Sequence, residues 1–200
     1  MHLFHGRGHR RAFSLIELMI VVALVGILAS LAVYGVRQYV ANAKTAEARN
    51  SVGLMSTDAA VAFERETVAA SILGGKTGAA SVRALCGSSS QSVPSSATSI
   101  KGVKYQSILT PGKDWSIDAP SNKGFACLKF MMSVPQYYMY NYSSDGNLAA
   151  APPVTGTRFA ALAEGDLNGN GILSTFEVLG AVTSNSLYVG PNIMETTPNE

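Results

Sequence analysis

Histidine is scarce in this chain and unevenly placed. The sequence of 200 residues has three histidines, His2, His5 and His9, all close to its start. The rest of the chain therefore lacks the commonest general base and the commonest zinc ligand. It also has no glycine-rich phosphate loop and no serine in the nucleophile-elbow spacing of hydrolases. We therefore expect a protein that is not an enzyme, and we interpret the three histidines as an accidental cluster rather than a metal site.

Cysteine is nearly absent too. Cys86 and Cys127 are the 2 cysteines, 41 positions apart. The missing Cys-x-x-Cys spacing argues against a redox-active pair. In an exported domain the pair would meet an oxidising compartment and close into a disulfide, which stabilises a loop of this length by about 4 kcal/mol in the chain-entropy model. Two buried free thiols are the alternative.

Formal charge is missing from one long stretch near the N-terminus. The 19 residues from Leu18 to Val36 carry no charged side chain, and about 20 mostly apolar residues suffice for a helix to span a bilayer. Glu17 stands at the start of this stretch, where a carboxylate is costly and indicates function. Arg7, Arg10 and Arg11 precede it and favour a cytoplasmic N-terminus with the remainder outside. A plain, unprocessed membrane anchor is the alternative.

The residues around Glu17 resemble the N-terminus of prepilins, the precursors of type IV pilins and of type II secretion pseudopilins. The matching run is Phe13-Ser14-Leu15-Ile16-Glu17-Leu18. The resemblance implies cleavage between Ala12 and Phe13, N-methylation of Phe13, and retention of the apolar helix. It also implies that Glu17 of one copy pairs with the new amine of a neighbouring copy. Ala12 stands where the family usually has glycine, and Tyr34-Gly35 stands where the family often has proline.

The resemblance further implies a domain organisation. It predicts a basic leader at 1–12, a transmembrane and assembly half of a long helix at 13–36, an amphipathic half at 37–75, and an exported head at 76–200. Loss of the three leader arginines from the 15 Lys and Arg leaves 12, against 13 Asp and Glu. This near-neutral balance gives no reason to expect nucleic acid as a specific partner.

The partners implied by the resemblance are the inner membrane, a prepilin peptidase and methyltransferase, a pilus assembly platform, and identical or related pilins. The product would be an extracellular fibre for adhesion, twitching motility or DNA uptake. The first alternative is a pseudopilin confined to the periplasm. The second is a membrane-tethered binding or sensor module, which would be neither cut nor polymerised.

Helix-forming residues continue beyond the apolar stretch. Residues 37–70 are rich in Ala, Glu, Lys, Arg and Met and contain no proline, a composition that favours helix. One apolar face is predicted from residues at three- and four-residue steps: Ala48, Val52, Met55, Ala59 and Phe63. Lys44 and Glu47 are spaced to pair. We expect the helix to run from Phe13 to about Leu73 and to stop at Gly74-Gly75.

The remaining residues favour a small sheet. Residues 88–99 are serine-rich and predict a loop. Four to six short strands are expected, bounded by turn residues, and the candidates are Lys101–Leu109, Asp114–Ala119, Phe125–Val134, Gln136–Ser143, Thr157–Glu164 and Ser174–Thr183. The predicted fold is α+β, with an antiparallel sheet packed on the second half of the helix. Both faces of 125–132 are apolar, which predicts a central strand there.

Four tyrosines crowd the strand at 136–143, namely Tyr137, Tyr138, Tyr140 and Tyr142. An aromatic surface for adhesion or subunit contact is one interpretation. Ordinary composition of a strand at a sheet edge is the interpretation that we prefer.

Residues 166–177 match the spacing of a twelve-residue calcium loop. The candidate ligands are Asp166, Asn168, Asn170, the carbonyl of Ile172, and Glu177, with Gly171 at the sharp turn. Helices should flank such a loop, but the flanking residues predict strands. The two Asn-Gly pairs are also strong hairpin-turn signals. A calcium site and a plain hairpin turn therefore both remain open from the sequence, with calcium as the one cofactor that it suggests.

Overall fold

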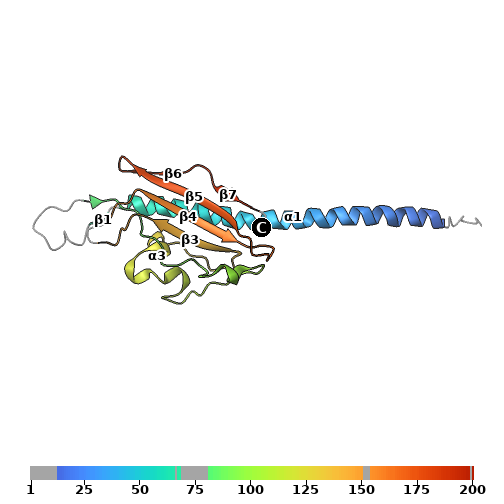
Figure 1. The fold of residues 1–200 in the computed structure, drawn as a ribbon, viewed down its shortest axis with the longest axis horizontal. Coiled ribbons are helices and arrows are strands. Elements are labelled where there is room, and N and C mark those ends of the chain that lie inside the picture. Colours follow the sequence, from blue (N-terminus) through green and yellow to red (C-terminus); the bar gives the residue numbers. More distant parts are fainter. Residues whose placement is uncertain (1–12, 66, 69–80, 151–153, 199) are drawn as a thin grey trace, which may run out of the picture. The chain divides into compact units, whose positions relative to one another are not determined.

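A computed structural model describes residues 13–65, 67–68, 81–150, 154–198 and 200 of the chain. The described residues form two α-helices, named α1 (Leu15–Glu64) and α3 (Gly124–Leu128) as in Figure 1. The labelled strands are β1 (Thr67–Val68), β2 (Ser81–Val82), β3 (Tyr138–Ser144), β4 (Arg158–Gly165), β5 (Ser174–Thr183), β6 (Ser186–Val189) and β7 (Met194–Thr196). Short 3-10 turns occupy Ala97–Ile100, Asp114–Ser116 and Ala119–Ser121.

The main sheet is antiparallel and follows the chain order β3-β4-β5-β6 (Figure 1). The last strand, β7, also pairs with β5, beside the stretch that β6 covers. Three of the six candidate strands are confirmed as β3, β4 and β5, and β5 has the predicted bounds. In these three strands buried side chains alternate with partly buried or exposed ones, because successive residues of a strand face opposite sides of the sheet.

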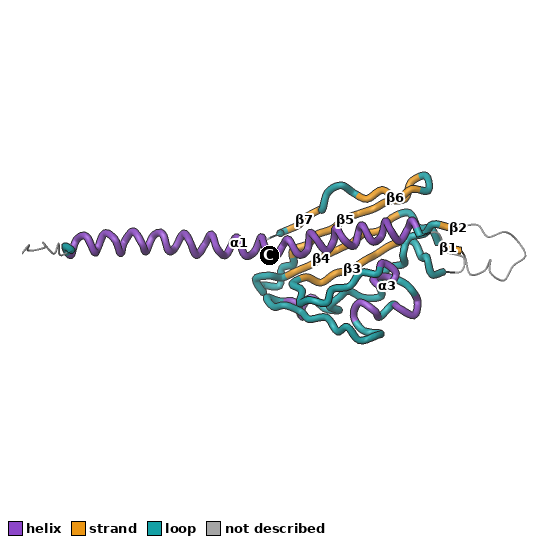
Figure 2. The backbone as a smooth tube through the Cα atoms, turned by 180° about the vertical axis from the view of Figure 1, so that it is seen from behind, coloured by secondary structure: helices purple, strands orange, loops and turns teal. Residues whose placement is uncertain are grey.

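The second half of α1 covers one face of this sheet, as the view in Figure 2 shows. All five residues of the predicted apolar face are buried, from Ala48 to Phe63. They pack in one core with the inward side chains of the strands, among them Tyr138, Tyr140 and Phe176. The described structure thus has the predicted α+β architecture, with a long N-terminal helix packed on a small antiparallel sheet.

The helix ends earlier than the sequence predicted. It stops at Glu64, not near Leu73, and the short strand β1 begins at Thr67 and pairs with β2. Thr67 and Val68 are β-branched, and such residues fit a strand better than a helix. The predicted stop at Gly74-Gly75 lies outside the described residues.

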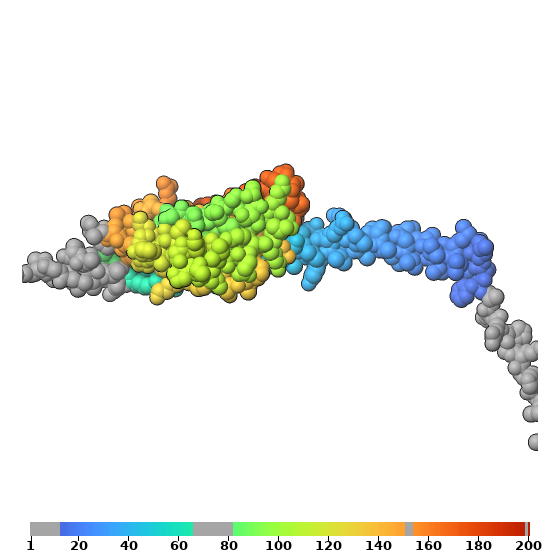
Figure 3. All heavy atoms as spheres, turned by 90° about the horizontal axis from the view of Figure 1, so that it is seen from below, coloured from blue at the N-terminus to red at the C-terminus, as the bar shows by residue number. Residues whose placement is uncertain are grey.

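The predictions for 101–134 are wrong. The segment 101–109 contributes one isolated bridge, between Tyr105 and Gln136. The segment 114–119 forms 3-10 turns, and 125–134 begins with the short helix α3, which ends where Lys129 adopts a positive φ of 66°. In Figure 3 the green and yellow atoms of residues 85–130 form much of the surface of the head on the side in view.

Tertiary contacts explain these irregular turns. The carboxylate of Asp114 accepts hydrogen bonds from the Tyr105 hydroxyl at 2.8 Å and the Ile108 amide at 2.6 Å. Next to it, the indole of Trp115 packs edge-on against the rings of Phe125 and Phe130, with centroids 4.9 and 5.4 Å away. These aromatic residues are buried as turn and helix residues, so their apolar character did not require a strand.

The polar side of α1 also binds the sheet. Glu47 accepts hydrogen bonds from the Tyr137 amide at 2.8 Å and the Tyr140 hydroxyl at 3.2 Å. Lys44 places its ammonium 4.6 Å from the centre of the Tyr137 ring. The predicted Lys44–Glu47 pair is not among the ion pairs of the described residues, because both side chains interact with the sheet instead.

Candidate processing and assembly segment

The helix α1 begins with a capping box, the reciprocal pairing of an N-cap hydroxyl and a carboxylate three residues later. The Glu17 carboxylate accepts hydrogen bonds from the backbone amide and the hydroxyl of Ser14, at 3.2 and 3.3 Å. The Ser14 hydroxyl in turn accepts from the Glu17 amide at 3.3 Å. These contacts satisfy backbone donors that a helix N-terminus leaves free. The Ser-x-x-Glu spacing of this capping box can be read directly from the sequence, although it is not among the predictions above.

The apolar stretch that follows is exposed along its whole length. No residue from Leu15 to Val40 is buried, and the first buried residue of α1 is Thr45. Among the described residues, α1 is the one helix that is long and apolar enough to span a membrane. A helix that is hydrophobic all round is normally buried, either in a membrane or in the core of a large protein.

The start of the chain matches a known family model, described as the prokaryotic N-terminal methylation motif, over residues 7–33. This is the prepilin leader signature of type IV pilins and pseudopilins. The match includes Ala12, Phe13 and Glu17. No solved structure matches the chain.

The prepilin signature implies processing by a prepilin peptidase, followed by pilus assembly. Together with the apolar helix, it fits anchoring in the inner membrane before assembly. Cleavage between Ala12 and Phe13 stays a prediction. The leader residues through Ala12, including the three histidines, lie outside the described residues. Phe13 is described and is 78% exposed.

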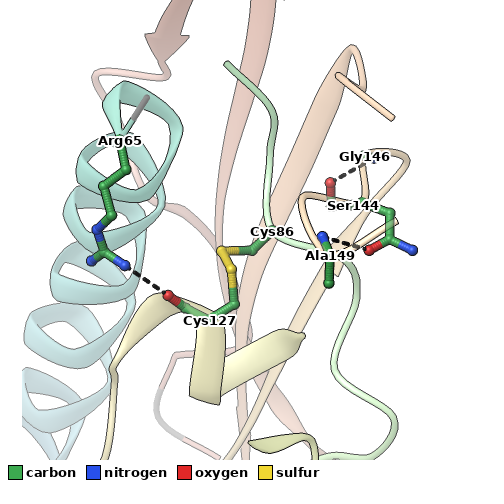
Figure 4. Close-up of a disulfide and its surroundings, with 7 residues drawn as sticks. Arg65, Cys86, Cys127, Ser144, Gly146 and Ala149 are labelled. Atoms are coloured by element: carbon green, nitrogen blue, oxygen red, sulfur yellow. Dashed lines mark hydrogen bonds between the residues drawn. A yellow bond between two sulfur atoms is a disulfide. The ribbon is translucent and has the colours of Figure 1, made fainter. Parts of the chain in front are cut away.

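The two cysteines form the predicted disulfide, Cys86–Cys127. Figure 4 shows that it joins α3 to the segment that follows β2, close to the end of α1. Both cysteines are buried. Just beyond α1, the guanidinium of Arg65 donates a hydrogen bond to the Cys127 carbonyl at 3.2 Å. The disulfide therefore lies where the helix, α3 and the segment after β2 converge.

The tyrosines of β3 do not form an aromatic surface. Tyr138, Tyr140 and Tyr142 are fully buried on the side of the sheet that faces α1. Burial raises the pKa of Tyr138 to about 12, with the negative charge of Glu47 adding to the effect. The strand is at the edge of the sheet in the strand order, as the preferred interpretation of the sequence had it.

The candidate calcium ligands lie in and after the loop between β4 and β5. Asp166 is buried, and its carboxylate accepts the backbone amides of Gly169, Asn170 and Gly171 at 2.7, 3.1 and 2.9 Å. Glu177 lies within β5 opposite Leu162 in the ladder, which is about 10 Å along the strands from the loop. The carbonyl of Ile172 lies between them in the sequence.

A different carboxylate contacts the two asparagines of this loop. The amides of Asn168 and Asn170 both donate to Oε2 of Glu200, at 2.5 and 2.7 Å. Among the described residues, no group of three His, Cys, Asp or Glu side chains is placed to hold a metal ion. The loop connects two paired strands as the hairpin interpretation predicted, and calcium binding stays a prediction.

Proposed function

We propose that this chain is a structural subunit of a type IV pilus, not an enzyme, and that it polymerises through its N-terminal helix into a surface fibre. In this proposal the precursor is cut between Ala12 and Phe13, methylated at Phe13, and withdrawn from the inner membrane into the fibre. The fibre would serve adhesion, twitching motility or DNA uptake.

The burial of side chains along α1 is the observation that carries the proposal. Residues 15–40 expose large apolar side chains such as Leu18, Ile20 and Leu24, at 60%, 56% and 56%. Covering that much apolar surface provides a strong driving force for association. Lipid supplies this cover in the precursor, and the same segment of neighbouring copies would supply it in a fibre.

The position of Glu17 supports a specific mode of assembly. Glu17 is one helical turn from Phe13 in the sequence, so the carboxylate and the new amine would lie near the same end of the apolar segment. Its partner in the described residues is Ser14, a neutral group. Within a stack of apolar helices, the amine of an adjoining copy would supply the positive charge that a buried carboxylate needs.

Substitution of Glu17 tests this mode of assembly. Glu17→Gln removes the charge but keeps an oxygen that can accept in the capping box, which tolerates Gln at this position. Loss of one partner of a buried ion pair costs about 3–5 kcal/mol, and the cost would recur at every copy. We therefore expect Glu17→Gln cells to lose sheared surface fibres while still containing the processed subunit.

Two matched variants separate charge from other effects. Ser14→Ala breaks the capping box and keeps the charge, at a cost of about 1 kcal/mol, so fibres should persist. Glu64→Gln removes a carboxylate at the far end of the same helix and should also leave fibres intact. Normal fibres from Glu17→Gln would contradict the pairing with the amine. An intact leader in mass spectra of the mature protein would contradict the proposal as a whole.

A pseudopilin has the same leader signature and would give the same result with Glu17→Gln in any assembly assay. Location distinguishes the two. Recovery of the chain in fibres sheared from the cell surface supports the pilus, whereas an assembly confined to the periplasm supports the pseudopilin. A membrane-tethered sensor would keep its leader and would assemble into neither.

A further inference from the structure

The loop between β4 and β5 contains two consecutive Asn-Gly pairs, Asn168-Gly169 and Asn170-Gly171. One buried side chain organises both. The Asp166 carboxylate, 2% exposed, accepts the Gly169 amide on Oδ1 at 2.7 Å and the Gly171 amide on Oδ2 at 2.9 Å. The two glycine nitrogens that follow the two asparagines are therefore both hydrogen-bonded to the same carboxylate.

Those glycine nitrogens are the nucleophiles of asparagine deamidation. The nitrogen loses its proton and attacks Cγ of the preceding asparagine, so that a new N–C bond forms and the Cγ–Nδ2 bond breaks with release of ammonia. Water then opens the cyclic imide to aspartate or isoaspartate. Glycine favours the attack because it has no Cβ to hinder the approach and permits many backbone conformations.

The observed contacts oppose each requirement of this reaction. The proton that must leave Gly169 or Gly171 is donated to a carboxylate, whose negative charge disfavours an anionic nitrogen beside it. The side chains that would be attacked are also held. Asn168 Oδ1 accepts the Asn170 amide at 2.9 Å, and Asn170 Oδ1 accepts the Ile172 amide at 2.6 Å.

We propose that Asn168 and Asn170 are latent deamidation sites, which the Asp166 carboxylate keeps closed in the folded protein. The proposal is independent of any role in a fibre. Reaction at position 170 would replace an amide donor with a carboxylate that faces Glu200 Oε2, now 2.7 Å from Asn170 Nδ2. Opening of the loop would thus add a negative charge to the hairpin. Where the product is isoaspartate, the backbone of the hairpin would also become longer.

Mass spectrometry of the full-length chain in detergent micelles tests the proposal. The chain is incubated at mildly alkaline pH with a chelator, either folded or in urea, and conversion of amide to carboxylate is followed in the peptide that contains both asparagines. Hydrogen bonds to charged groups contribute about 1.5–3 kcal/mol, so closure should slow the reaction about 10- to 100-fold relative to the unfolded chain. Folded Asp166→Asn loses the charge and one of the two acceptor oxygens, so positions 168 and 170 should react faster than in the folded unmodified chain.

A matched variant controls for general loosening of the fold. Asp118 is also buried and accepts a backbone amide, that of Ser90 at 2.8 Å, in another part of the head. Asp118→Asn should leave deamidation at positions 168 and 170 as slow as in the unmodified chain. The proposal is overturned if the folded unmodified chain reacts as fast as in urea, or if folded Asp166→Asn reacts as slowly as the unmodified chain.

Hydrogen exchange gives a second measurement, which needs no variant and applies even if Asp166→Asn does not fold. The amides of Gly169 and Gly171 should exchange far more slowly in the folded protein than in urea, because their protons are held by Asp166. Exchange of both amides at the rate of the unfolded chain would overturn the proposal.

Discussion

The two halves of α1 differ in how they cover their apolar side chains. Residues 41–64 place one apolar face against the sheet, with Val52 and Met55 fully buried, and leave Leu54 and Val61 about half exposed on other sides. Residues 15–40 carry large apolar side chains on consecutive positions, and none of these is buried. One continuous helix therefore covers its apolar side chains with the sheet along its second half, whereas the large apolar side chains of its first half are exposed in the described structure.

The carboxylates of the two halves differ in the same way. Glu47 accepts hydrogen bonds from two distant residues of the same chain, the Tyr137 amide and the Tyr140 hydroxyl. Glu17 contacts the neighbouring Ser14. A carboxyl whose hydrogen-bond donors come from the same chain belongs to the fold of the head, and a charge without a cationic partner in an apolar segment indicates a partner elsewhere. The comparison therefore separates residues that make contacts within the head from residues to which the proposed function assigns a role in assembly.

Removing the disulfide should have one of the two largest effects on stability and should act on the head alone. For the Cys86→Ala/Cys127→Ala variant we expect a loss of about 4 kcal/mol, since the 41-residue separation no longer restricts the unfolded chain. Denaturant unfolding followed by Trp115 fluorescence measures this loss, because Trp115 is the one tryptophan and is buried in the head.

Chemical reduction of the unmodified chain provides the control and should shift the Trp115 transition by a similar amount. Circular dichroism in detergent should show no loss of helix attributable to residues 15–40. An unchanged Trp115 transition, or melting of the apolar half together with the head, would remove the distinction between the two regions.

A pair of methionines in the same helix provides the most direct test of the comparison. Met55 is 0% exposed and Met19 is 62% exposed. Met55→Ala should destabilise the head by about 2–5 kcal/mol, the usual cost of truncating a buried side chain to alanine. Met19→Ala should leave the Trp115 unfolding transition of the full-length chain unchanged, so equal shifts for the two variants would contradict the comparison.

Residues with a regular local pattern were predictable from the sequence. The face of α1 from Ala48 to Phe63 follows helical spacing, and β5 alternates clearly enough that its bounds were predicted. The leader signature was also readable, because its meaning lies in consecutive residues. In each case the signal is contained within one segment and requires no knowledge of what packs against it.

Residues organised by distant contacts were not predictable in this way. The turns after Tyr105 depend on the buried carboxylate of Asp114, and α3 lies where Cys127 meets Cys86. An apolar run such as 125–130 is compatible with a buried strand or a short helix, and only tertiary packing decides between them. The strand β6 was missed because its four residues are too few to show a repeating pattern.

In the candidate segment, both the charge of Glu17 and the Ser-x-x-Glu spacing that pairs it with Ser14 are local features, and both can be read from the sequence. Glu47 is different, because the sequence paired it with Lys44, which is close along the chain. Its actual partners are 90 and 93 positions away. Local spacing therefore predicts which residues carry unusual chemistry better than it predicts which groups they contact.

The pH dependence of Glu47 should be the smallest of these effects on stability. Burial raises the pKa of Glu47 above its ordinary value of 4.5, although the hydrogen bonds from Tyr137 and Tyr140 and the positive charge of Lys104 lower it. A carboxyl with a raised pKa binds more protons when folded. Its stabilising contribution is therefore complete below the unfolded pKa and is lost as the pH rises through the folded pKa.

Glu47→Gln should remove this decline while keeping an oxygen for both donors, the Tyr137 amide and the Tyr140 hydroxyl. The measurement is the Trp115 unfolding transition of each chain, compared across the weakly acidic range from just above pH 4.5. Lys104→Met sharpens the test, because loss of its positive charge should raise the pKa of Glu47 further and move the decline to higher pH. If Glu47→Gln keeps the pH profile of the unmodified chain, another group causes the decline. The contacts of Glu47 within the head would then explain its behaviour no better than the contact with Ser14 explains that of Glu17.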